Sequence, residues 1–160
     1  MTNGGFSGGK EQGVAMMEQI NDEIFVGPPA TRAELIHRKI KYVIDVSGIS
    51  RHGHGYKCDC VYPIADGGRS NDPEQFLKIM YAIDKALKAG KKPILIQCHG
   101  GVSRSPAIAA LYMYHASKFK TFDDAIGYVR TRSKAFVPNL ELIDFIKREV
   151  CSEIDRDNKS

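Results

Sequence analysis

A short apolar run, residues 94–97, ends at Cys98, and the seven residues that begin there read CHGGVSR. The adjacent glycines Gly100 and Gly101 can adopt backbone conformations that turn successive N–H groups toward one point. Arg104, six positions after the cysteine, adds a guanidinium group that can bind two oxygens of one phosphate or sulfate. This spacing predicts an anion-binding loop with a cysteine at its base.

Cys98 is the predicted nucleophile of this loop. The backbone N–H groups and the guanidinium make the surroundings positive, which favours the thiolate, the form of cysteine that attacks. The loop leaves an expected strand and enters an expected helix, so the helix N-terminus adds further N–H groups. A tetrahedral anion would then lie with its central atom facing the sulfur.

Four alternatives compete with a nucleophilic role for this loop. A nucleotide-binding P-loop requires a GK[ST] ending that is missing here, and a redox site requires a CxxC motif or a second cysteine nearby. A purely structural glycine turn would leave Arg104 without a role. Phosphate binding without turnover stays open at this point.

A phosphoryl-transfer reaction also needs an acid that protonates the leaving oxygen. The segment ADGGRSND, residues 65–72, follows an expected strand and offers two carboxylates, Asp66 and Asp72. Because Asp72 precedes Pro73 at a helix start, it is better explained as a helix cap, and Asp66 is preferred as the acid. Asp45 lies inside an apolar strand and is expected to be structural.

The remaining pattern is an alternation of strands and helices. It predicts an α/β fold with a mostly parallel central sheet flanked by helices, in which ligands bind at the carboxyl ends of the strands. The expected strands are 23–27, 42–47, 58–64 and 94–97, and the expected helices begin at Thr31, Pro73, Arg104, Thr121 and Pro138.

Composition limits the class of protein. The chain has 160 residues, 42% of them hydrophobic and 26% charged, which is typical of one soluble domain. A formal net charge of +4 suits an anionic substrate and is too small to indicate nucleic-acid binding. No run reaches the roughly 18 apolar residues of a membrane helix, so no membrane partner is expected.

The four cysteines are Cys58, Cys60, Cys98 and Cys151. We expect free thiols in a reducing compartment, cytoplasmic or nuclear. Cys58 and Cys60 lack the matching pair that zinc binding requires, so no metal and no cofactor are predicted.

Residues 1–16 are predicted to be a flexible tail, 17–150 the catalytic domain and 151–160 a polar tail.

These motifs together resemble the cysteine-dependent protein tyrosine phosphatases and, within them, the small atypical dual-specificity phosphatases. CHGGVSRS resembles the C-x5-R-[ST] signature, and SRSP followed by AIAALYMY resembles the dual-specificity branch. YPIADGG resembles the segment with the general acid, and Asp66 lies 32 residues before Cys98. The opening segment 17–48 and the closing segment 121–146 also resemble that family.

The resemblance implies a role for each residue of the loop. Cys98 would form a phosphocysteine, Asp66 would act as general acid and then base, and Ser105 would stabilise the departing thiolate. Arg104 would bind the phosphate together with the loop residues His99, Gly100, Gly101, Val102 and Ser103. The expected substrates are phosphoproteins carrying phosphotyrosine and phosphoserine or phosphothreonine. A non-protein phosphoester and a non-catalytic phosphate-binding scaffold are the alternatives.

One position departs from the family pattern. The family usually has a histidine directly before the cysteine, whereas this chain has Gln97 and carries His99 after the cysteine. A glutamine can donate a hydrogen bond but cannot carry a positive charge. We therefore expect less thiolate, and lower activity, at mildly acid pH than is usual for the family.

Overall fold

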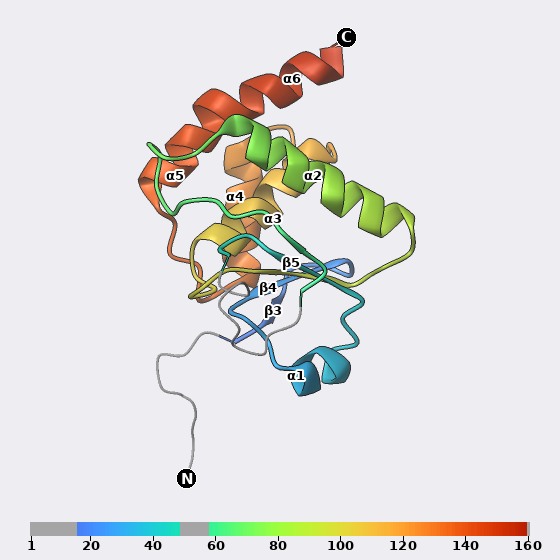
Figure 1. Cartoon of the computed structure of the whole chain (residues 1–160). Helices are drawn as coiled ribbons and strands as arrows, with labels where there is room; N and C mark the ends of the chain where they lie inside the picture. The colour runs from blue at the N-terminus through green and yellow to red at the C-terminus, as the bar shows by residue number, and fades with distance from the viewer. Residues whose placement is uncertain (1–15, 49–57, 160) are drawn as a thin grey trace.

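The computed structural model describes residues 16–48 and 58–159, which form a five-stranded sheet with helices on both faces (Figure 1). The strand order is β3-β4-β7-β5-β6, and β3 alone among these strands runs antiparallel to its neighbour. The strands are β3 (Glu18–Gln19), β4 (Ile24–Gly27), β5 (Tyr42–Asp45), β6 (Cys60–Val61) and β7 (Ile94–Gln97). The predicted α/β fold with a mostly parallel sheet is confirmed.

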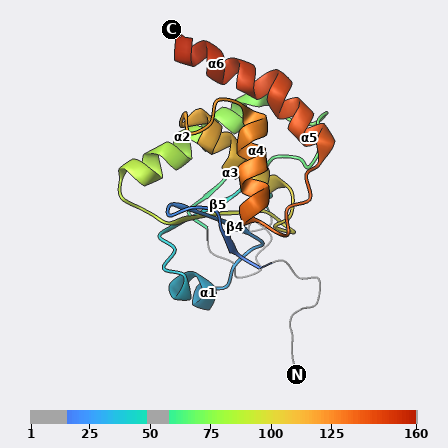
Figure 2. The same cartoon turned by 180° about the vertical axis from the view of Figure 1, so that it is seen from behind.

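The helices divide unequally between the two faces of the sheet. They are α1 (Arg32–His37), α2 (Pro73–Lys88), α3 (Arg104–His115), α4 (Phe122–Arg132), α5 (Leu140–Phe145), the π-helical segment η2 (Ile146–Val150) and α6 (Cys151–Lys159). Figures 1 and 2 show α1 alone on one face and the other helices gathered on the opposite face. None of the described helices is long and apolar enough to span a membrane.

The central strand β7 serves both cores because successive side chains of a strand point to opposite faces. Ile94 and Ile96 belong to the main core under α2 and α3. Leu95 belongs to a smaller core on the α1 side, where it is joined by Phe25 and Val43. The C-terminal end of β7, where the candidate loop begins, is therefore held from both faces.

Side-chain caps fix where the helices begin. Thr31 forms a complete capping box with Glu34, and the Asp72 carboxylate accepts from the Glu74 N–H at 3.0 Å, as the sequence predicts. The helix expected to begin at Pro138 corresponds to α5. It begins at Leu140, because Asn139 is its cap.

The predicted polar tail at 151–160 is wrong for most of its length. The chain continues from η2 into α6, and Cys151 and Ile154 are 7% and 2% exposed within the main core. Two apolar residues one turn apart are too few to predict this helix from the sequence. The short strand β3 also lies outside the predicted elements. The predicted tail at 1–16, apart from Met16, lies outside the described residues, as do residues 49–57.

Candidate active site

The candidate loop, residues 98–103, connects β7 to α3 at the carboxyl edge of the sheet. The N–H of Cys98 donates to the Gly27 carbonyl at the end of β4, at 3.1 Å. Gly101 has a φ of +72°, and a Cβ there would lie 2.4 Å from the Pro28 nitrogen. Only glycine fits at this position, because any side chain would overlap the neighbouring backbone.

The Cys98 side chain lies at the base of the loop, with 2% of the residue exposed. Its sulfur accepts a hydrogen bond from the Ser105 N–H at 3.4 Å and lies 3.4 Å from the Ser105 hydroxyl oxygen. Ser105 is in the first turn of α3, so the sulfur faces the positive end of that helix. A thiolate here could accept from both groups, which is the arrangement that the predicted roles of Cys98 and Ser105 require.

Arg104 is half-buried and does not point away from the site. Its Nη1 donates to the Ile64 carbonyl at 3.0 Å, and Ile64 stands just before the segment that carries Asp66. Guanidinium has five N–H donors, so this bond leaves several for the oxygens of a phosphate. The arginine thus links the candidate loop to the segment with the proposed acid.

Asp66 is exposed, and its carboxylate is hydrogen-bonded to the same loop. The Ser103 hydroxyl donates to Asp66 Oδ1 at 2.7 Å. Ser103 is the residue before α3, where a serine would ordinarily cap the helix, yet its side chain makes no capping bond. The hydroxyl is directed to the carboxylate instead.

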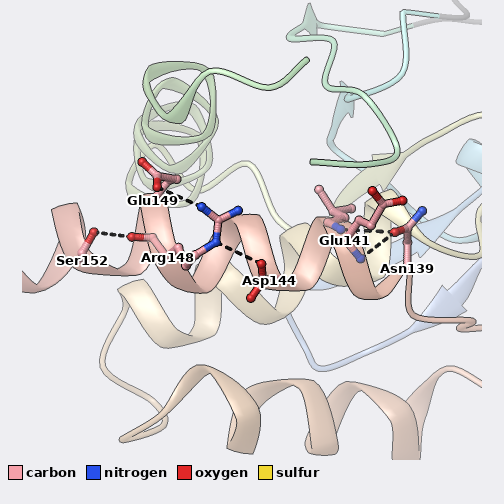
Figure 3. A network of polar contacts seen from close by, with 7 residues as sticks. Asn139, Glu141, Asp144, Arg148, Glu149 and Ser152 are labelled. Carbon is pink, nitrogen blue, oxygen red and sulfur yellow. Dashed lines mark hydrogen bonds and ion pairs between the residues drawn. The ribbon is translucent and has the colours of Figure 1, made fainter. Parts of the chain in front are cut away.

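The backbone of Asp66 is held from a third segment. Asn139 Nδ2 donates to the Asp66 carbonyl at 2.9 Å. The Oδ1 of the same side chain accepts from the N–H groups of Glu141 and Leu142 and so caps α5 (Figure 3). The N–H of Val137 donates to the Val102 carbonyl at 2.7 Å. These bonds join the segments around residues 66, 102 and 138.

Sequence reasoning does not reach these roles of Ser103 and Asn139. The sequence places Ser103 only in the anion-binding loop and predicts no contact between Asn139 and the site. A serine before one helix and an asparagine before another are visible signals of caps, but the pattern does not tell which side chains also reach Asp66.

Asp72 and Asp45, the two aspartates weighed beside Asp66 in the sequence, have the structural roles predicted for them. Asp72 caps α2. Asp45 is buried, and its Oδ1 accepts from the Ser47 N–H and hydroxyl, both at 2.9 Å, and from the Gly48 N–H at 3.2 Å. Its carboxylate supports the turn after β5, which is a structural role.

The remaining loop residues differ in exposure. His99 and Gly100 are exposed, whereas Val102 is half-buried. Gln97, directly before Cys98, is fully buried, and neither polar atom of its side chain has a hydrogen-bond partner among the described residues. The donated bond that a glutamine could supply here is not made.

No disulfide joins the other cysteines among the described residues, Cys58, Cys60 and Cys151. Burial raises the pKa of Cys151 to about 12. Burial likewise raises the pKa of Cys60. Within residues 16–48 and 58–159, no group of three or more His, Cys, Asp or Glu side chains could hold a metal ion.

A family model, the catalytic domain of dual-specificity phosphatases, matches residues 25–148. This chain belongs to that family. The match includes Asp66, Cys98, Arg104 and Ser105, and it lies within the range predicted as the catalytic domain. The predicted family, the dual-specificity phosphatases, is thereby confirmed.

A sequence relative agrees with this assignment. The tyrosine-protein phosphatase vhp-1 of Caenorhabditis elegans is 33% identical over 81 residues, which are 51% of this chain and 12% of that protein. The chain thus matches only about an eighth of the length of this relative.

Solved structures share the fold. The human tyrosine phosphatase-like serine/threonine/tyrosine-interacting protein has a TM-score of 0.70 at 22% identity, with 90% of this chain and 98% of that chain covered. Human DUSP28 has a TM-score of 0.72 at 16% identity, with 88% and 99% covered. At these identities the likeness establishes the fold alone.

Proposed function

We propose that this chain is a protein phosphatase that hydrolyses phosphotyrosine, phosphoserine and phosphothreonine through a phosphocysteine intermediate. The observation that carries the proposal is the hydrogen bond between Ser103 and Asp66. It ties a carboxyl group to the loop whose base holds Cys98 and whose end holds Arg104. Nucleophile, anion-binding group and acid are thus within one connected set of side chains.

In the first step, the Cys98 thiolate attacks phosphorus and an S–P bond forms as the P–O bond to the substrate breaks. The loop N–H groups and the Arg104 guanidinium stabilise the charge on the three other phosphate oxygens. Protonated Asp66 gives its proton to the departing phenol or alcohol oxygen, which is worth roughly 10²–10⁴-fold in rate.

In the second step, water attacks the phosphocysteine and Asp66, now a carboxylate, accepts a proton from it. The S–P bond breaks, phosphate leaves, and the electron pair returns to sulfur. The Ser105 hydroxyl, 3.4 Å from that sulfur, is placed to donate to the thiolate and so to favour its departure.

The choice of phosphoproteins rests on the chemistry of the loop. Between Cys98 and Arg104 stand His, Gly, Gly, Val and Ser, so no permanent positive charge besides Arg104 is available for a second phosphate group. A phosphate monoester on a protein side chain needs one such group only. Because a phosphatase of this kind needs a reduced thiol at Cys98, we place the protein in a reducing compartment, the cytoplasm or the nucleus.

Turnover of p-nitrophenyl phosphate tests the proposal. Wild type should hydrolyse it, Cys98→Ser should lose all turnover, and Asp66→Asn should lose roughly 10²-fold or more. Asp72→Asn is the matched control, because Asp72 caps α2 and should affect stability and not rate. A steep loss in Asp72→Asn with full activity in Asp66→Asn would assign the acid to Asp72.

The alternative function is a scaffold that binds phosphorylated partners without hydrolysis. It is favoured by the buried, unpartnered Gln97 at the position before Cys98. Tight binding of a phosphopeptide by wild type together with no turnover of any phosphoester would establish the scaffold and reject the enzyme.

A further inference from the structure

Helix α1 is less covered than the other helices. None of its residues is buried, whereas α2, α3, α4 and α5 each bury several side chains. Ile36 is 67% exposed. Because α1 lies alone on its face of the sheet, no other described helix packs over it (Figures 1 and 2).

A hollow of about 420 Å³ runs along α1 and the turn that follows. It is lined by three cationic and three apolar side chains: Arg32, Leu35, Ile36, Lys39, Ile40 and Lys41. No carboxylate is among them, and within the described ranges none of the three cations forms an ion pair. The hollow therefore combines apolar contact surface with uncompensated positive charge.

The acidic groups next to the hollow are engaged elsewhere. Glu34 Oε1 accepts from the N–H and the hydroxyl of Thr31, at 2.8 and 3.0 Å, in the capping box. Asp59 Oδ2 accepts from the Val43 N–H at 2.7 Å. Within the described ranges, neither carboxylate forms an ion pair with the cations of the hollow. The lining itself carries three positive charges and no negative one, so its charge complements a negatively charged partner.

The hollow is connected to the candidate active site by a short stretch of chain. Pro28 lies against Gly101 of the loop, and α1 begins four residues later, at Arg32. A helix of six residues is about 9 Å long, whereas an extended peptide covers about 3.3 Å per residue. A substrate with its phosphate in the loop could thus reach the hollow with a segment roughly five to ten residues away.

We propose that this hollow, which we call the α1 groove, docks an acidic and apolar segment of the phosphoprotein substrate. Carboxylates of that segment would pair with Arg32, Lys39 and Lys41, and a leucine or isoleucine would lie against Ile36. The inference rests on the proposed phosphatase function and adds a second, separate requirement for substrates. A lipid bilayer fits less well, because the groove is concave and α1 has only six residues, too few for a helix that inserts its face into a membrane.

Two synthetic phosphotyrosine peptides test the groove. Both share the same phosphorylated core and differ in an extension of equal length, which alternates Asp or Glu with Leu or Ile in one and consists of Gly and Ser in the other. We expect kcat/KM of the wild type to be about tenfold higher for the acidic and apolar extension, through a lower KM. This advantage should shrink as sodium chloride rises from about 50 to 300 mM.

Variants identify the residues responsible. Lys39→Glu/Lys41→Glu should abolish the advantage, and Ile36→Gln should reduce it without changing the charge. The matched control is Lys118→Glu/Lys120→Glu, which makes the same charge change on two exposed lysines between α3 and α4 and should keep the advantage. All these variants should hydrolyse p-nitrophenyl phosphate like the wild type, because none alters the loop.

The experiments distinguish a failure of the proposed phosphatase function from a failure of docking at the α1 groove. If p-nitrophenyl phosphate is not hydrolysed, the proposed function fails, and docking is still measured as binding of the fluorescently labelled peptides to Cys98→Ser. Equal binding of both peptides, or an equal loss in the groove variants and the control, would reject the α1 groove. Binding of phosphatidylserine vesicles that requires Lys39 and Lys41, without preference between the peptides, would replace it with a membrane site.

Discussion

At the scale of single residues, the structure gives the Ser103 hydroxyl a contact that the sequence does not predict. It donates to Asp66 at 2.7 Å instead of capping α3. This bond fixes the direction of the carboxylate. Ser103 is therefore a positioning residue for the proposed general acid.

Replacing Ser103 with alanine should lower kcat about three- to tenfold, a part of what the acid itself contributes. The loss should be larger with phenyl phosphate than with p-nitrophenyl phosphate, because the poorer leaving group depends more on protonation. Ser103→Thr, which keeps the hydroxyl, should restore both the rate and the response to the leaving group. Identical losses for both substrates would mean that Ser103 supports only the fold.

Gln97 is the second residue with a testable effect. Its amide is fully buried and unpartnered among the described residues, and an unsatisfied buried polar atom costs about 1–3 kcal/mol. No positive charge accompanies it at this position. In the proposed mechanism, Arg104, the loop N–H groups and Ser105 therefore stabilise the thiolate without a further positive charge from this position.

Gln97→His should raise activity at the acid limb of the pH–rate profile relative to wild type, because an imidazolium favours the thiolate. Gln97→Leu is the control, since it removes the unpartnered amide without adding charge. It should leave the acid limb in place and leave thermal stability equal or higher. An unchanged acid limb in Gln97→His would contradict the expected role of this position.

At the scale of elements, α2 and α3 are joined by a polar cluster far along α3 from the active site. The Tyr112 hydroxyl donates to Asp84 Oδ1 at 2.7 Å, and His115 Nε2 lies 3.0 Å from Asp84 Oδ2. Burial alone would raise the pKa of Asp84, but the hydrogen bonds with His115 and Tyr112 outweigh burial and lower it. Because α3 begins at the candidate loop, this cluster helps hold the helix that presents Arg104 and Ser105.

Asp84→Asn should lower the free energy of unfolding at pH 7 by about 1–2 kcal/mol. A carboxyl with a lowered pKa stabilises the fold above its unfolded pKa of about 3.9, and this contribution disappears as the pH falls through the lower folded value. The difference between wild type and variant in urea unfolding should therefore be full at pH 7 and vanish once the pH falls below the lowered pKa of the folded state. Asp123→Asn, which breaks the exposed pair with Lys147, is the control and should cost less than about 0.5 kcal/mol. A pH-independent difference for Asp84→Asn would show that the ionised carboxylate is not what matters.

At the scale of the whole molecule, the C-terminal helix completes the main core. The segments α5, η2 and α6 form one continuous rod, within which the Ser152 hydroxyl donates to the Arg148 carbonyl at 2.9 Å (Figure 3). Ile154 is 2% exposed within that core. The folded unit therefore extends beyond residue 150, past the end of the family match at residue 148.

Ile154→Ala should destabilise the protein by about 2–4 kcal/mol, because it leaves a cavity at a fully packed position. Thermal unfolding followed by circular dichroism measures the effect. Asn158→Ala, at an exposed position of the same helix, is the matched control and should change stability little. Equal melting temperatures for both variants would mean that α6 does not contribute to the core.

Local signals in the sequence determined much of this protein. Strong apolar runs such as 94–97, helix caps such as Thr31 and Asp72, and the spacing of Cys98 and Arg104 each depend on residues close in the chain. These signals predict the α/β class, most element positions and the nucleophile. They fail at α6, because only two side chains of this polar stretch, Cys151 and Ile154, are buried. The core that these two side chains contact is supplied by distant segments of the chain.

Tertiary structure decided which distant side chains meet. Hydrogen bonds join Asp66 to Ser103 and to Asn139, and Ile64 to Arg104. The partners are at least 37 positions apart in the sequence, and they meet only because the strands end at one edge of the sheet. The same holds for Asp84 with Tyr112 and for the uncovered face of α1. Sequence spacing sets which groups are present, but hydrogen bonds act only over about 3 Å, so only the folded chain determines which of those groups bond to one another.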